Sequence, residues 1–337
     1  MSSASVCISA TELTRTYTRY AVREKGLPLI RRIFRDRQLI PALQGASFEI
    51  SSGEIVGLLG PNGASKSTTV KLLCGILTPT SGTCTVQGFV PSKDRKEYVK
   101  SIGAVFGQRT QLWWDVPIRD SFSLLRDIYG ADRHAWKARE EELTDALELS
   151  SFMNAPLRQL SLGQKMRAEV CAALLHRPSL LFLDEPTIGL DSPSKVKLRS
   201  FLRQENEQYG TTILLTTHDM EDMTALCPRV LVLGRGHLLA DTTLDALFAR
   251  YGKYQRLHCR IPETLSLPDA LLELQHAGSI RMSRQGELLD LIFDPHLVSA
   301  QRILELLLRA GSMEGITLSQ EDADALVSRM YREMKLI

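Results

Sequence analysis

A glycine-rich stretch, GPNGASKST at residues 60–68, contains the residue types that bind phosphate groups. In the pattern G-x-x-x-x-G-K-[ST], successive backbone N–H groups point at the phosphates. Gly60 and Gly63 permit the tight turn that this requires. Lys66 can bridge the β- and γ-phosphates, and the hydroxyl of Ser67 can ligate magnesium. The stretch therefore predicts a phosphate loop, and the alternative is a plain Gly/Ser turn that precedes a lysine.

The position before the lysine departs from this pattern, because Ser65 stands where the pattern has its second glycine. Serine keeps the backbone N–H that phosphates need, but it adds a Cβ and loses the conformational freedom of glycine. It is also small and compatible with the start of a helix. We therefore expect a working loop, whose contacts with the ligand come from Gly60, Pro61, Asn62, Gly63, Ala64, Ser65, Lys66, Ser67 and Thr68.

A second stretch, RPSLLFLDEP at residues 177–186, is an apolar run that ends in two acids. If this run is a strand of a parallel sheet, its end lies beside the phosphate loop, because functional loops gather at the carboxyl ends of such strands. Asp184 can then hold magnesium, and Glu185 is placed to polarise a water molecule. The alternative is that the two acids only begin a loop.

Strand and helix patterns alternate around these residues. EIVGLLG at residues 54–60 is a short apolar run typical of a buried strand, and a helical pattern follows the loop. TTILLTTHD at residues 211–219 is another apolar strand with polar residues at its end, and RVLVLGRGHLLA predicts a hairpin that turns at residues 234–236. The alternation predicts an α/β fold with a mainly parallel sheet.

Other short motifs accompany the two stretches. LSLGQ at residues 160–164 is followed by a helix and then by the Asp-Glu strand, and GLD occupies residues 189–191. His218 ends the next strand in TTHD, and Gln108 ends VFGQ at the edge of a helical region. In their types and order these motifs resemble those of ABC-family ATPases, whose signature LSGGQ has a glycine where this chain has Leu162.

The resemblance covers about residues 5–250 and implies a P-loop NTPase fold with a RecA-like core. An antiparallel β-subdomain and a helical subdomain, at about residues 108–165, would flank that core. Two such domains would dimerise head to tail, with ATP between the phosphate loop of one and the signature of the other. Because this chain has each motif once, two complete sites need a second ATP-binding subunit, identical or paralogous. The implied cofactors are ATP and Mg²⁺.

Roles of family residues carry over onto the matching positions of this sequence. Glu185 would be the general base for the attacking water, and His218 would steady the γ-phosphate. Asp191 would link the two sites of the dimer. Magnesium would be held by Ser67, Gln108 and Asp184. Further contacts with ATP would come from Tyr17, stacked on adenine, and from the signature residues Ser161, Gly163 and Gln164.

Within the family, VFGQRTQLWWDVPIRDSFSLLRDIYG at residues 105–130 resembles ATPase subunits of bacterial exporters, some of them viologen-exporter-like. Their membrane subunits are separate chains. No apolar run here approaches the roughly 18 residues that suggest a membrane span, so we expect docking on integral membrane partners at the cytoplasmic face of the cell membrane. Trp113 and Trp114, just past Gln108, suit such a contact. The alternative is that these tryptophans pack into the helical subdomain.

A basic stretch at residues 15–37 is a candidate for peripheral contact with the membrane. It includes an insertion at about residues 18–41, in which Ile30, Ile33 and Phe34 fall on one helical face. A basic amphipathic helix can lie against anionic headgroups. The alternative is a solvated insertion. Its basic residues are Arg15, Arg19, Arg23, Lys25, Arg31, Arg32, Arg35 and Arg37.

The pattern changes after about residue 251. An alternating strand, helices and a further hairpin predict a separate small α+β domain over residues 251–337, after an ATP-binding domain at residues 1–250. The net charge of +2 and the lack of an extended basic face argue against a nucleic-acid partner. The second hypothesis, after an ATPase subunit of an exporter, is a soluble ABC ATPase that acts on the translation or DNA machinery. A degenerate regulatory subunit is the third hypothesis, and Ser65 is the feature that favours it.

Overall fold

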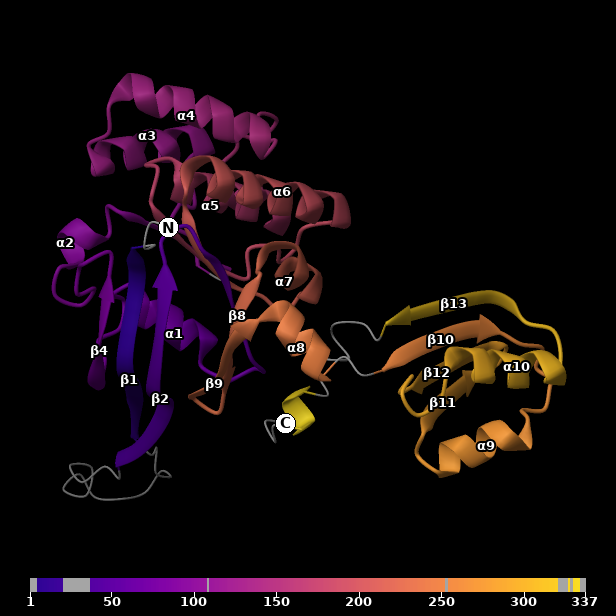
Figure 1. The fold of residues 1–337 in the computed structure, drawn as a ribbon. Helices are drawn as coiled ribbons and strands as arrows, with labels where there is room; N and C mark the ends of the chain where they lie inside the picture. The colour runs from indigo at the N-terminus through magenta and orange to yellow at the C-terminus, as the bar shows by residue number, and fades with distance from the viewer. Residues whose placement is uncertain are drawn as a thin grey trace, which may run out of the picture. The chain divides into compact units, whose positions relative to one another are not determined.

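The computed structural model describes residues 5–20, 37–107, 109–251, 254–320, 327 and 330–333. They form two compact units, one ending at Thr243 and the other beginning at Leu244. Figure 1 shows that each unit has its own sheet and helices. The sequence places the boundary after residue 250, whereas the structure groups helix α8, Leu244–Tyr251, with the second unit.

A six-stranded sheet forms the centre of the first unit, with the strand order β5-β6-β7-β3-β8-β9. All neighbouring strands are parallel except β8 and β9, which form the predicted antiparallel hairpin. The interior strands are continuous apolar runs because both of their faces are covered. This confirms the α/β fold with a mainly parallel sheet. The strands are β3 (Ile55–Leu59), β5 (Ile102–Phe106), β6 (Leu180–Asp184), β7 (Thr212–Thr216), β8 (Arg229–Gly234) and β9 (His237–Thr243).

A second, three-stranded sheet has the order β2-β1-β4 and is antiparallel. Strand β1 spans Val6–Tyr20, β2 spans Arg37–Ser51 and β4 spans Ser81–Val86. Apolar side chains of this sheet, of helix α1 (Lys66–Leu73) and of the central sheet share one buried core. Most of the predicted basic insertion, residues 21–36, lies outside the described residues.

Helices α3 (Ile118–Tyr129) and α4 (Arg133–Ala146) stack together at one end of the first unit, beside α5 (Leu162–Leu174), as Figure 1 shows. A buried ion pair, in which Nη2 of Arg139 lies 2.5 Å from Oε1 of Glu205, joins α4 to α6. Within the described residues, no helix is long and apolar enough to cross a membrane. The other helical elements are α2 (Arg95–Tyr98), η2 (Leu157–Gln159), α6 (Ser192–Tyr209) and α7 (Met220–Leu226).

The second unit has the element order βαββαβ after α8, and its antiparallel sheet has the strand order β11-β12-β10-β13. This is the topology of ferredoxin-like domains. Leu257, Leu291 and Phe293 of the sheet pack with Ile303 and Leu307 of α10 in a separate core. The elements are β10 (Gln255–Arg260), α9 (Asp269–His276), β11 (Ile280–Gln285), β12 (Leu288–Phe293), α10 (Ala300–Ala310) and β13 (Glu314–Gln320).

Candidate active site

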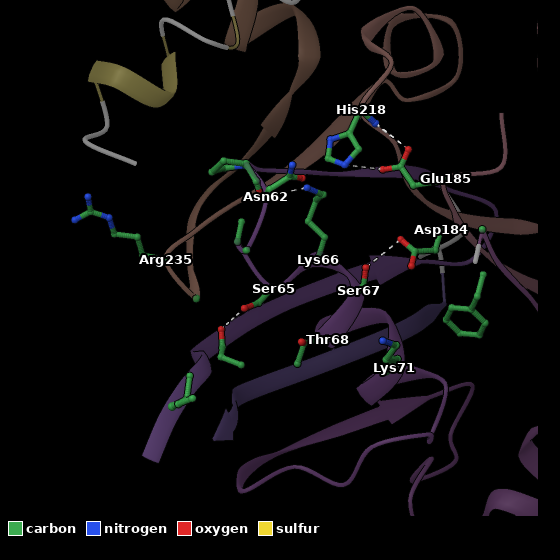
Figure 2. Close-up of a pocket in the computed structure, with 18 of the residues that line it drawn as sticks. Asn62, Ser65, Lys66, Ser67, Thr68, Lys71, Asp184, Glu185, His218 and Arg235 are labelled. Carbon is green, nitrogen blue, oxygen red and sulfur yellow. Dashed lines mark hydrogen bonds and ion pairs between the residues drawn. The ribbon is translucent and has the colours of Figure 1, made fainter. Parts of the chain in front are cut away.

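A cavity of about 710 Å³ lies where strands β3, β6 and β7 end, and Figure 2 shows side chains from several loops around it. Parallel strands end at the same edge of a sheet, so the loops that follow them meet there. The structure thus brings together most residues of the predicted phosphate loop with the two acids and the histidine. Those in the cavity wall are Pro61, Asn62, Gly63, Ala64, Ser65, Lys66, Ser67, Thr68, Asp184, Glu185 and His218.

The phosphate loop wraps around the ammonium group of Lys66. Its Nζ donates hydrogen bonds to the carbonyl oxygens of Gly60, at 2.5 Å, and Pro61, at 3.3 Å. Burial lowers the pKa of Lys66. Gly60 does not line the cavity but permits a close approach, because an added Cβ would lie 2.4 Å from the carbonyl oxygen of Leu233. The loop N–H groups and the N-terminus of α1 form a setting that favours a phosphate anion.

Ser65 has left-handed backbone angles, with φ 82° and ψ 18°. It is the N-cap residue of α1, as its compatibility with a helix start predicts, but its side chain makes no capping hydrogen bond to the helix. Its hydroxyl instead donates a hydrogen bond to the carbonyl oxygen of Ala42 in strand β2, drawn in Figure 2. Serine is strained at such angles, and the hydrogen bond ties the phosphate loop to the neighbouring sheet.

Asp184 ends strand β6 beside the phosphate loop. Its Oδ1 accepts hydrogen bonds from the hydroxyls of Ser67, at 3.3 Å, and of Thr216. Its own carbonyl oxygen accepts a hydrogen bond from the backbone N–H of Gly107, at 2.9 Å. The arrangement places a hydroxyl and a carboxylate, which are the oxygen ligands that Mg²⁺ prefers, on one side of the cavity.

Glu185 and His218 face each other across the cavity edge. Nε2 of His218 lies 3.2 Å from Oε1 of Glu185, and the backbone N–H of His218 donates to Oε2, also at 3.2 Å. Burial raises the pKa of Glu185, and the nearby His218 opposes this shift. A partly buried carboxylate whose pKa is raised, and which is oriented by a histidine, can accept a proton from water.

The signature residues lie outside the cavity wall. Ser161 caps the N-terminus of helix α5, and its hydroxyl accepts from the backbone N–H of Gln164 in a reciprocal capping box. Gly163 approaches Gly189 so closely that an added Cβ would lie 2.9 Å from the Gly189 carbonyl oxygen. Leu162 is half exposed and covers Gly189. The cavity and the signature are therefore separate parts of one chain's surface.

Asp191 likewise lies outside the cavity wall. It caps helix α6 by accepting a hydrogen bond from the backbone N–H of Ser194 at 2.9 Å. Hydrogen bonding from the side chain of Ser194, and then from its backbone N–H, lowers the pKa of Asp191.

Tyr17 does not line the cavity, although the resemblance places adenine beside it. Its hydroxyl lies 3.5 Å from Oγ1 of Thr68, and the guanidinium of Arg15 lies 5.0 Å from its ring centroid. Its partner in the strand register, Ile40 of β2, lines the cavity instead. Gln108 lies outside the described residues.

Several residues of the cavity wall have no motif in the sequence. The wall also includes Ile40, Pro41, Ala42, Lys71, Phe106, Gly107, Arg109, Ile188, Arg235 and Gly236. Arg235 and Gly236 belong to the hairpin turn that the sequence predicts. The residues of that turn do not indicate that it lies beside the phosphate loop. Strand β2 holds it there, because the backbone N–H of Gln44 donates to the Gly236 carbonyl oxygen at 2.7 Å.

Comparison with known proteins agrees with this geometry. Residues 43–188 match the family described as ABC transporter. The chain is 34% identical over 210 residues to the linearmycin resistance ATP-binding protein LnrL of Bacillus subtilis, which covers 62% of this chain and 67% of that one. It is 31% identical over 276 residues to the methionine import ATP-binding protein MetN 2 of Enterococcus faecalis, with 78% and 80% covered.

Among solved structures, the ATP-binding cassette MJ0796, in a dimeric post-hydrolysis state bound to ADP and Pi, superposes with a TM-score of 0.60. The two chains are 26% identical, and the match covers 70% of this chain and 98% of MJ0796. The fold, the motif order and these relatives agree, so this chain belongs to the ABC transporter ATP-binding proteins and is an ATPase.

Proposed function

We propose that ATP is hydrolysed in the cavity at Lys66, Glu185 and His218. The observation that carries this proposal is the Glu185–His218 pair, with two contacts of 3.2 Å, in the same cavity wall as the phosphate loop. The backbone N–H groups of the loop bind the phosphates, and Lys66 neutralises the charge that develops on them. Glu185 accepts the proton of the attacking water, and His218 orients Glu185 and donates toward the γ-phosphate.

Ser67 and Asp184 fit a magnesium ion. Their oxygens lie 3.3 Å apart on the side of the cavity that faces the loop, and both are hard donors. When bound with ATP, the ion neutralises phosphate charge and orients the nucleotide. Gln108, which the resemblance assigns as a third ligand, would come from the segment between Gly107 and Arg109, both of which line the cavity.

We propose further that two ATP-binding subunits work as a pair. The signature residues Ser161, Gly163 and Gln164 lie outside the cavity wall of their own chain, so a contact with ATP requires a second subunit. Tyr17, whose hydroxyl lies 3.5 Å from Oγ1 of the cavity residue Thr68, is proposed to stack on adenine. A second copy of this chain is the simplest partner, and a paralogue is the alternative.

The pair is proposed to power export through separate membrane subunits, as in the viologen-exporter-like subgroup. Trp113 and Trp114 support a docking surface, because they are 37% and 53% exposed. Nζ of Lys165 lies 4.6 Å from the Trp114 ring centroid, within the range of a cation–π contact. The basic stretch at residues 15–37 would add a contact with anionic headgroups at the cytoplasmic face, and the second unit would be an accessory domain.

Purification of the tagged chain from membranes, followed by identification of co-purifying membrane proteins, tests the partner. Reconstitution of that complex in vesicles then tests the direction of transport. With ATP on the side of the ATPase, export predicts substrate movement away from that side, and movement toward it would instead favour import. Deletion of residues 22–38 should weaken recruitment to vesicles with anionic lipid, and unchanged recruitment would rule out the lipid contact.

A further inference from the structure

Asp222 is a fully buried carboxylate in helix α7, at which three segments of the chain meet. Its Oδ2 accepts hydrogen bonds from the hydroxyls of Thr187, at 2.5 Å, and Thr217, at 3.2 Å. Its Oδ1 accepts a hydrogen bond from Nε of Arg199 in helix α6, at 2.5 Å. Both threonines are themselves buried. A carboxylate removed from water needs such donors, and here they come from two loops and a helix.

The two threonines flank the proposed catalytic pair. Thr187 lies just past Glu185 in the loop after β6, and Thr217 directly precedes His218 in the loop after β7. The Thr217 hydroxyl also accepts a hydrogen bond from the backbone N–H of Asp219, at 3.0 Å, on the other side of His218. One carboxylate therefore fixes the two loops relative to each other.

Glu185 needs this support because its backbone has φ 59°, a conformation that residues other than glycine adopt rarely. Its contacts with His218 connect loops that follow different strands. A displacement of about 1 Å at a reacting group can lower a rate by about 100-fold. The relative position of the two loops is thus expected to control the rate of hydrolysis.

The ion pair with Arg199 does not account for all the contacts that Asp222 makes. The guanidinium of Arg199 also lies 3.6 Å from Asp219 and 3.3 Å from Glu221, so this cation has other carboxylate partners. Arg199 pairs with Oδ1 of Asp222, whereas both threonine hydroxyls donate to Oδ2. We propose that Asp222 is a positioning residue for ATP hydrolysis, which holds Glu185 and His218 in register through Thr187 and Thr217. This inference rests on the roles proposed above for Glu185 and His218.

Substitutions at Thr187 test the proposal in the full chain. Thr187→Val removes the hydroxyl and keeps the shape of the side chain, so we expect kcat for ATP hydrolysis to fall about 10-fold. The affinity for ATP should change less than about twofold, because Thr187 does not line the cavity. Thr187→Ser keeps the hydroxyl and should restore kcat.

Thr212→Val is the matched control. Thr212 is buried at the opposite end of β7, where its hydroxyl accepts a hydrogen bond from the backbone N–H of Gly53 at 2.9 Å. We expect this variant to keep the kcat of the parent chain. An equal loss of kcat in Thr212→Val would show that any buried hydroxyl of this sheet has the same effect, and would overturn the proposal.

Asp222→Asn should lower kcat at least as much as Thr187→Val. Adding Thr187→Val to Asp222→Asn should cause no further loss, because the hydrogen bond that Thr187→Val removes is already lost in Asp222→Asn. A Thr187→Val variant with the kcat of the parent would overturn the proposal, and so would a Thr187→Ser variant as slow as Thr187→Val. Glu185→Gln distinguishes failure of the proposed function from failure of the positioning role. If Glu185→Gln still hydrolyses ATP, the catalytic role of Glu185 is wrong. If Glu185→Gln is inert while Thr187→Val is fully active, only the positioning role of Asp222 is wrong.

Discussion

Replacing Ser65 separates two opposing effects at the most unusual position of the phosphate loop. With φ 82°, a residue that carries a Cβ is strained by about 1–2 kcal/mol. The hydrogen bond from its hydroxyl to the carbonyl oxygen of Ala42 contributes about 0.5–1.5 kcal/mol. Because the two quantities are similar in size, we expect the hydrogen bond to offset most of the strain.

Ser65→Ala keeps the strain and removes the hydrogen bond, so the free energy of unfolding should fall by about 1 kcal/mol. Ser65→Gly removes both, and its free energy of unfolding should stay within about 0.5 kcal/mol of the parent. Gly63→Ala measures strain alone, because Gly63 has φ 81° and an added Cβ would meet no atom within 4 Å. That control should lose about 1 kcal/mol.

Urea unfolding of the full chain measures these changes. Tryptophan fluorescence reports on the first unit, because all three tryptophans, Trp113, Trp114 and Trp136, lie there. A Ser65→Ala variant as stable as the parent would refute the argument that the Ala42 hydrogen bond offsets strain. ATPase activity decides the functional question separately. The parent and Ser65→Gly should both hydrolyse ATP, and an inert parent beside an active glycine variant would establish the degenerate-subunit hypothesis.

Three further changes test the site and the fold. Lys66→Ala should weaken ATP binding by at least about 10-fold, since it removes the cation at the phosphates; unchanged affinity in a binding titration would contradict the phosphate loop. Glu185→Gln should lower turnover by at least about 100-fold and preserve ATP binding. In the parent, burial raises the pKa of Glu185. A general base must be unprotonated, so kcat should rise with pH, with an apparent pKa above the ordinary value of ~4.3 for glutamate. A kcat that does not change with pH down to about pH 4 would argue against this base. Glu205→Ala leaves Arg139 buried with Glu142, at 2.9 Å, as its remaining carboxylate partner, and should lower the free energy of unfolding by about 3 kcal/mol; a loss under about 1 kcal/mol in urea titration would show that the buried pair is replaceable.

Much of the site's framework follows from local sequence pattern. Strand β3 ends at Leu59 and helix α1 begins at Lys66, so the strand–loop–helix order around residues 60–68 is as predicted. Asp184 ends β6, and His218 follows β7. Apolar runs and glycine spacing predict these elements because each depends on neighbours within a few residues, and the rule for parallel strands then places their ends together.

Contacts between distant segments do not follow from local sequence pattern. Ser65 meets Ala42, and Ile40 rather than Tyr17 lines the cavity, because strand register and the path of β2 decide which side chain faces the loop. The sequence also does not predict the left-handed backbone of Ser65, because a serine before a helical pattern indicates only a helix start.

The fold class, the ATPase family and the charged and hydroxyl residues of the site follow from the pattern of the sequence. The contact between Glu185 and His218, and the link between their loops through Asp222, Thr187 and Thr217, are visible only in the folded chain. Local periodicity sets the type of each element, whereas side-chain contacts across a sheet depend on packing, register and twist summed over the whole chain.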